Sequence, residues 1–265
     1  MTASWVLDIG GVTVALAGPA ERIAPFANVW ADWTGTDASW SIELVEDDVL
    51  PAPDDSYFAA RPQFEDDGCT LSTTGFRGHI RPADQTAELR FHPKANDGDV
   101  AYFVRTVFAL AAFDQQKLLF HSAGIVHHKK AYCLFGHSGS GKTTASRLSK
   151  GKPVLSDDLL LLAPAESGID VWATPFGRRR YPEMRIAPLR SLLRLIQASE
   201  DRLLSMPRSE ALVDLVANSP VINANVEDVP QLIEGWTQML SKIPVHRLYF
   251  RKANTFWEVI DAYFR

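Results

Sequence analysis

The 265-residue sequence predicts a mixed fold with α+β and α/β character. We expect a β-rich N-terminal domain over residues 1–95, a connecting helix over 96–117 and an α/β domain over 118–265 that ends in helices. Three observations predict this division. Alternating apolar residues fill the first part, a glycine-rich loop separates a predicted strand from a predicted helix in the last part, and helical periodicity returns near the C-terminus.

Composition indicates a folded protein and excludes some classes of function. Apolar residues make up 46% and charged residues 22%, which is typical of a chain that buries a core. The net charge of -5 argues against a nucleic acid or an anionic membrane as a partner. No stretch approaches the roughly 20 apolar residues of a membrane span, and the N-terminus lacks a signal-peptide pattern. We therefore expect a cytoplasmic protein.

The two cysteines, Cys69 and Cys133, are far apart in the sequence. They match neither a disulfide framework nor a zinc pattern, which requires clustered ligands. We expect both to be reduced residues of the core.

The N-terminal domain is predicted from apolar alternation between turn-forming clusters. The expected strand regions are 5–17, 38–45, 69–80 and 86–92. Val100, Phe103 and Val107 then recur at helical spacing, which predicts an amphipathic helix over 97–116 with Asp97 as its cap.

The C-terminal domain is predicted to begin with a hairpin, whose two strands flank the turn at 127–130. Further strands are expected at 153–156, 159–163, 171–174 and 245–250. Helices are expected directly after the glycine-rich loop, at 189–197, 209–217 and 229–241, and after Asn254.

Residues 136–143 fit the pattern G-x-x-x-x-G-K-[ST] at every position. Glycines let such a loop curl so that backbone N–H groups face phosphate oxygens, the lysine reaches the β- and γ-phosphates, and the final hydroxyl can hold magnesium. The strand before the loop and the helix after it are the context that this motif requires. We expect ATP to contact Gly136, His137, Ser138, Gly139, Ser140, Gly141, Lys142, Thr143 and Thr144.

An acidic pair, Asp157 and Asp158, follows the strand predicted at 153–156. A helix of about ten residues spans roughly the length of a five-residue strand, so the chain could return and enter a neighbouring parallel strand. The pair would then lie at the carboxyl end of that strand, beside the glycine-rich loop, where parallel sheets bind their ligands. An acidic turn that caps the next segment is the structural alternative.

Together these segments resemble the catalytic core of the HPr kinase/phosphorylase family and its serine-kinase relatives. That family has a His-bearing strand, a Walker A loop and an Asp-Asp pair in close succession, as do the related phosphoenolpyruvate carboxykinases. The matching residues are His121 to Val126, the loop at 136–143 and Ser156 to Asp158. The resemblance covers 118–163, with a weaker echo at 174–176, and implies a P-loop domain of the HPr kinase/PEP carboxykinase type.

The resemblance implies a role for each matching residue. Lys142 would bind the phosphates and Thr143 the magnesium ion. Asp157 would be the general base toward an acceptor serine, Asp158 would support the metal, and His121 would lie near the γ-phosphate. Because adjacent strand residues face opposite ways, only one aspartate should point at the acceptor, and we favour Asp157.

The implied activity is an ATP- and Mg²⁺-dependent kinase that phosphorylates a serine hydroxyl of a protein, a peptide or a small molecule such as free serine. After Asp158 the sequence has no counterpart of the family's glycine-containing signature for the reverse reaction. Its N-terminal domain also differs from that of the HPr enzymes, so HPr as substrate and phosphorylase activity stay open. A nucleotide-dependent switch or ATPase is an alternative and a carboxykinase-like enzyme is another, and homo-oligomerisation is open as well.

Several other polar residues have both a functional and a structural interpretation. On its own, His121 could be a hydrogen-bonded core histidine. His127 and His128, beside two lysines at a turn, are expected to be solvated. Arg178, Arg179 and Arg180 could clamp phosphates or an acidic acceptor, or form a solvated face. Arg247 and Arg251 are expected on the exposed side of a strand.

Overall fold

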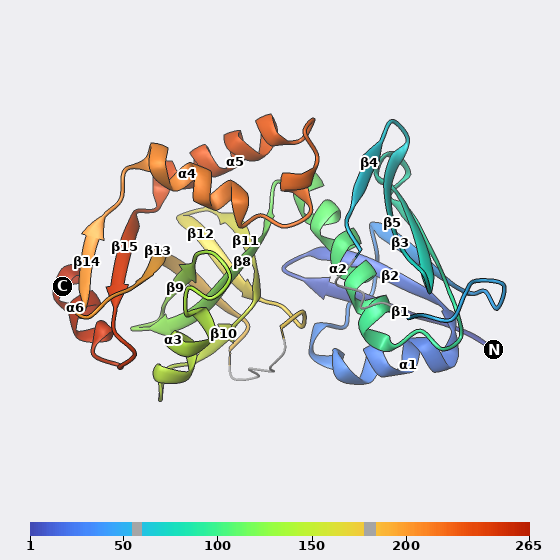
Figure 1. Cartoon of the computed structure of the whole chain (residues 1–265), viewed down its shortest axis with the longest axis horizontal. Helices are drawn as coiled ribbons and strands as arrows, with labels where there is room; N and C mark the ends of the chain where they lie inside the picture. The colour runs from blue at the N-terminus through green and yellow to red at the C-terminus, as the bar shows by residue number, and fades with distance from the viewer. Residues whose placement is uncertain (55–59, 178–183) are drawn as a thin grey trace. The chain divides into compact units, whose positions relative to one another are not determined.

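The computed structural model describes residues 1–54, 60–177 and 184–265. They form a mixed α/β protein with two sheets and six α-helices within the described parts. Contacts divide the chain into two compact units, Met1–Gln115 and Gln116–Arg265 (Figure 1). Among the helices of these residues, none is both long enough and apolar enough to span a bilayer.

The first unit contains a seven-stranded sheet in the order β1-β2-β3-β7-β6-β5-β4. β2, β3 and β7 are parallel to one another, and the remaining neighbours are antiparallel. All four predicted strand regions lie in this sheet, and the regions at 5–17 and 69–80 each form a hairpin. The strands are β1 Thr2–Ile9, β2 Val12–Pro19, β3 Trp40–Glu46, β4 Gln63–Glu65, β5 Gly68–Thr73, β6 Phe76–Arg81 and β7 Thr86–Phe91.

Two helices complete the first unit: α1 (Ala20–Val29), which the sequence did not predict, and α2 (Asp97–Asp114). The predicted cap of α2 is wrong by one residue. Asn96 caps it, because its side chain accepts the N–H of Asp99 while the Asp99 carboxylate accepts the N–H of Asn96. α2 is buried on nearly all sides, so it is less amphipathic than predicted. Phe103 packs so closely on Gly78 of β6 that a Cβ there would lie 2.1 Å from the ring.

The second unit contains an eight-stranded sheet in the order β10-β8-β11-β12-β13-β15-β14, with β9 paired to both β8 and β13. β9, β13 and β15 are parallel. The strands are β8 Leu118–His127, β9 Lys130–Phe135, β10 Val154–Ser156, β11 Leu159–Ala165, β12 Gly168–Ala173, β13 Ile186–Gln197, β14 Arg202–Ser205 and β15 Val245–Phe250.

The predicted hairpin at 118–135 is confirmed as the antiparallel pair β8–β9. Its turn residues, His128 and Lys129, both have positive φ, of 49° and 61°. Left-handed conformations at both positions are typical of two-residue hairpin turns.

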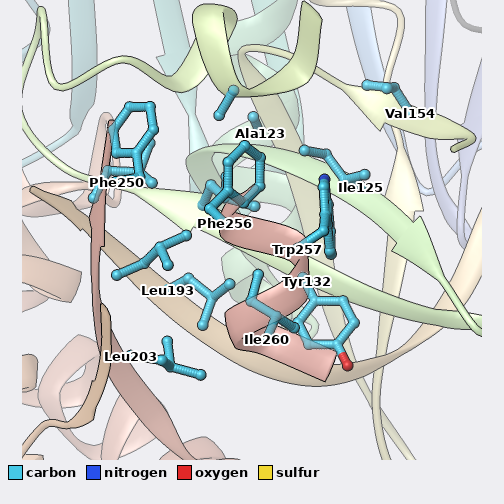
Figure 2. Packing of buried hydrophobic residues seen from close by; sticks show 14 residues of the cluster. Ala123, Ile125, Tyr132, Val154, Leu193, Leu203, Phe250, Phe256, Trp257 and Ile260 are labelled. Atoms are coloured by element: carbon cyan, nitrogen blue, oxygen red, sulfur yellow. The ribbon is translucent and has the colours of Figure 1, made fainter. Parts of the chain in front are cut away.

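Helices cover both faces of the second sheet. They are α3 Lys142–Leu148, α4 Arg208–Ala217, α5 Val229–Lys242 and α6 Phe256–Phe264. α3 and α6 enclose a core with Ile125, Leu134 and Leu193 on one face (Figure 2). On the opposite face, Trp236 of α5 packs 4.9 Å from Phe120 of β8, and α4 lies beside α5 (Figure 1).

Two predictions about this unit are wrong. Residues 189–197 form part of strand β13 instead of a helix, because they pair with β9 on one side and β15 on the other. Leu189, Leu192, Leu193 and Ile196 have helical spacing in the sequence, which is why the segment was predicted as a helix. β10 does not neighbour a parallel strand; it pairs with β8 in antiparallel fashion. The short strand β14 was not predicted.

Candidate functional site

The glycine-rich loop connects β9 to α3, as the motif requires. Gly136, Gly139 and Gly141 have positive φ, of 146°, 82° and 107°. Backbone conformations of this kind favour glycine, which has no Cβ to clash. Gly141 also lies against Phe250 of β15, because a Cβ at this glycine would be 2.6 Å from the ring.

Lys142 is buried and folds back over the loop that precedes it. Its Nζ donates to the carbonyl oxygen of Gly136 at 2.8 Å. Burial lowers the pKa of Lys142 from its ordinary value, and the nearby Asp158 carboxylate opposes part of that shift. The lysine is therefore held at the loop, next to an acidic side chain from the turn after β10.

The sheet order brings the acidic pair to the same edge as the loop. β9 and β10 both run antiparallel to β8, on either side of it, so their carboxyl ends lie at one edge of the sheet. The loop and the acidic pair therefore lie at the same edge as expected, although the antiparallel strand β8 lies between β9 and β10. His121, near the start of β8, is at this edge too, and its Nε2 lies 3.2 Å from Oδ1 of Asp158.

The turn after β10 orients the two aspartates differently. Oγ of Ser156 accepts the backbone N–H groups of Asp158 and Leu159 at 3.2 and 3.3 Å, which fixes the turn. Asp157 is buried at 7% exposure. The Asp158 side chain is 35% exposed and faces His121, whose side chain is 40% exposed.

Other members of the predicted site are at the surface of the loop or beside it. His137, Ser138 and Thr143 are exposed, and Ser140 is buried. Thr174 lies next to the acidic turn, since its hydroxyl donates to the carbonyl oxygen of Leu159 at 2.8 Å.

Arg178, Arg179 and Arg180 lie outside the described residues. The predicted contact of these arginines with phosphates or an acceptor therefore stays a prediction.

The sequence did not indicate two residues that contact the site. Gln197, at the end of β13, donates from Nε2 to the carbonyl oxygen of Gly139 at 2.8 Å. The backbone carbonyl oxygen of Asn218, after α4, accepts the backbone N–H of His121 at 2.8 Å. The sequence predicted a helix at Gln197. Recognising β13 as a parallel neighbour of β9 would have placed the carboxyl end of β13, and so Gln197, beside the loop.

Of the two histidines expected to be solvated, only His128 is, with 76% of its side chain exposed. His127 is 12% exposed, and its Nε2 lies 2.7 Å from Oδ1 of Asp261 on α6. The prediction for His127 is wrong because α6 covers the base of the hairpin turn. Arg251 is exposed as predicted, but it follows β15 and pairs with Asp201. Arg247, on β15, is only 23% exposed and pairs with Glu210.

Both cysteines are free and buried, as predicted. Burial raises the pKa of the Cys69 thiol to about 12. It also raises the pKa of Cys133, which lies in β9. Neither thiol is therefore a nucleophile at neutral pH.

No protein-family model and no curated protein matches this chain. Among solved structures, it is similar to the Hpr(Ser) kinase/phosphatase from Coxiella burnetii, with a TM-score of 0.32 and 11% sequence identity. The alignment covers 55% of this chain and 95% of that one.

Proposed function

We propose that this protein is an ATP- and Mg²⁺-dependent kinase that transfers the γ-phosphoryl group to a serine hydroxyl. The observation that carries the proposal is the convergence of three elements at one sheet edge. Lys142 comes from the phosphate loop, Asp157 and Asp158 come from the turn after β10, and His121 comes from β8. Phosphoryl transfer requires positioning and charge neutralisation, and these residue types supply both.

The residues of the loop suit a magnesium nucleotide. Thr143 offers an exposed hydroxyl and Asp158 a partly exposed carboxylate, and Mg²⁺ prefers such oxygen ligands. When bound, Mg²⁺ would neutralise charge on the β- and γ-phosphates. Lys142 would exchange its bond to the Gly136 carbonyl for phosphate oxygens, gaining a charge-assisted contact.

For the transfer step we propose Asp157 as the general base. The acceptor oxygen attacks the γ-phosphorus, the bond from that phosphorus to the β,γ-bridging oxygen breaks, and ADP leaves with the bonding electrons. The hydroxyl proton passes to the carboxylate. Asp158 is proposed to support the metal ion. His121, whose Nε2 lies 3.2 Å from Oδ1 of Asp158, is proposed to orient that carboxylate near the γ-phosphate.

We propose that the acceptor is a protein, a peptide or free serine, and that groups outside the loop select it. The loop and the aspartates are fully used by the nucleotide and the reacting hydroxyl. Arg178, Arg179 and Arg180 remain the proposed contacts for an acidic acceptor.

Calorimetry tests the nucleotide site. Lys142→Ala should abolish most MgATP binding, whereas Lys150→Ala, which replaces an exposed lysine after α3, should bind like the wild type. ATP binding by Lys142→Ala with wild-type affinity would contradict the site assignment.

A second experiment separates the two aspartates. Asp157→Asn should keep MgATP binding and lose transfer by ~10²–10⁴-fold, because an amide cannot accept the proton. Asp158 is the more exposed of the pair. Loss of transfer with retained binding in Asp158→Asn alone would assign the base to Asp158 instead.

A further inference from the structure

A second cluster of ligand-type side chains lies away from the phosphate loop, at the opposite end of β9. It consists of His127 and His128, at the tip of the β8–β9 hairpin, and Asp261, in α6. The acceptor and donor atoms of these three side chains all lie within 4.8 Å of one another. Nothing in the proposed phosphoryl transfer uses them.

The spacing of the three side chains is close to that of a metal site. Nε2 of His127 lies 2.7 Å from Oδ1 of Asp261, and Nε2 of His128 lies 3.5 Å from the same oxygen. Zinc bonds of about 2.0–2.2 Å in a tetrahedral site place neighbouring ligand atoms about 3.3 Å apart. Small side-chain rotations would therefore bring the three atoms to coordinating positions.

The core fixes two of the three ligands. The His127 ring packs 4.8 Å from that of Trp257, which belongs to the buried cluster between α6 and the sheet (Figure 2). The same helix carries Asp261 one turn later. His128 is exposed and can rotate to complete the set.

The ligand types select the kind of ion. Lys130, Arg190 and Arg265 line the adjoining hollow of about 310 Å³ with His128 and Asp261. Lys152 acts on His127 electrostatically as well. These positive charges repel every divalent cation alike, so the ligand types decide, and hard cations such as Mg²⁺ or Ca²⁺ prefer several oxygen ligands where this cluster has one carboxylate. Two imidazoles and one carboxylate instead suit a borderline ion such as Zn²⁺.

We infer that His127, His128 and Asp261 form a binding site for a zinc-type transition-metal ion that ties α6 to the β8–β9 hairpin. An ion there would join two segments distant in the sequence. It would stabilise the second unit, because only the folded chain brings the three ligands together.

The test is a Zn²⁺ titration of the full chain without a histidine tag, at pH 7.5, against a chromophoric chelator. We expect one equivalent to bind, and a fall in affinity of at least tenfold in both His128→Asn and Asp261→Asn. His79→Asn is the control, because His79 is a partly exposed histidine 3.7 Å from Asp67 in the first unit. It should bind like the wild type.

Melting with and without Zn²⁺ gives an independent reading. Zn²⁺ should raise the melting temperature of the wild type and of His79→Asn, and should not shift that of His128→Asn. Mg²⁺ at equal concentration should not displace the bound Zn²⁺. His128 is mostly exposed, so this variant is expected to fold; circular dichroism checks that. Absence of one-equivalent binding, or unchanged affinity in the two site variants, would overturn the inference.

Discussion

Gly141 shows how one residue links the phosphate loop to the core. Its φ of 107° is left-handed, and Phe250 occupies the space where a side chain would begin. Gly139 is also left-handed, at 82°, but nothing lies within 4 Å of its missing Cβ. Substitutions at the two glycines therefore distinguish the cost of backbone strain from the cost of steric contact.

We predict that Gly141→Ala lowers stability more than Gly139→Ala. Both carry the left-handed penalty of roughly 1–2 kcal/mol, and only Gly141→Ala must also displace the Phe250 ring. Urea unfolding of both variants measures the difference. Equal losses would mean that the loop moves away from Phe250 without cost.

The sequence could indicate the glycines, Lys142 and Thr143 as candidate site residues because their pattern is local. The motif predicts both the backbone conformation and the chemistry. The contacts of Gln197 and Asn218 could not. They depend on which strands and loops lie side by side, and neither residue belongs to a local pattern.

At the scale of elements, the sequence predicted strands well where one face alternates with the other, as in β3, β7 and β15. It failed at β13, where the spacing of Leu189, Leu192, Leu193 and Ile196 fits a helix. It also placed β10 beside a parallel strand, because strand order is a long-range property. The edge of the sheet at which Asp157 and Asp158 lie was still predicted correctly, since β9 and β10 run in the same direction.

β13 ends beside the glycine-rich loop, and we propose that Gln197 positions this loop. We predict that Gln197→Ala weakens MgATP binding by about fivefold, because the lost hydrogen bond to the Gly139 carbonyl is worth roughly 1 kcal/mol. Gln238→Ala, an exposed change on α5, is the control. Calorimetry on both variants checks this, and identical affinities would mean that the bond does not organise the loop.

α6 begins next to a buried carboxylate, Asp201, which accepts hydrogen bonds from Arg251 and Thr255. Burial raises the pKa of Asp201, but these bonds lower it by more, so the net shift is downward. Its contribution to stability is therefore fully present above about pH 4, the ordinary range of an aspartate, and is lost as the pH falls through the lower, folded-state pKa.

We predict that Asp201→Asn is less stable than the wild type at pH 7 and that the difference shrinks below about pH 4, where Asp201 itself becomes protonated. Urea midpoints at pH 7, 4 and 3 measure the trend. Asp170→Asn, on β12, is the matched control. A difference that stays constant over this range would rule out the Asp201 ion pair as its source.

At the scale of the whole molecule, the chain forms two compact units, and the residues proposed for catalysis and for metal binding all belong to the second. The sequence located the candidate site within that unit because the phosphate loop, the aspartate pair and His121 follow one another closely. It gave no function for the first unit, whose sheet has strand patterns but no chemical motif.

The central claim is phosphoryl transfer from ATP to a serine hydroxyl, and the most direct measurement is transfer of a γ-phosphate label from ATP into an extract of the source cells. With Mg²⁺, the wild type should label an acceptor on serine, identified by mass spectrometry. Lys142→Ala and Asp157→Asn should leave it unlabelled, and Lys150→Ala should label it normally. Release of labelled phosphate at the same rate with and without extract, and no labelled acceptor, would contradict the kinase and indicate a nucleotide-hydrolysing switch.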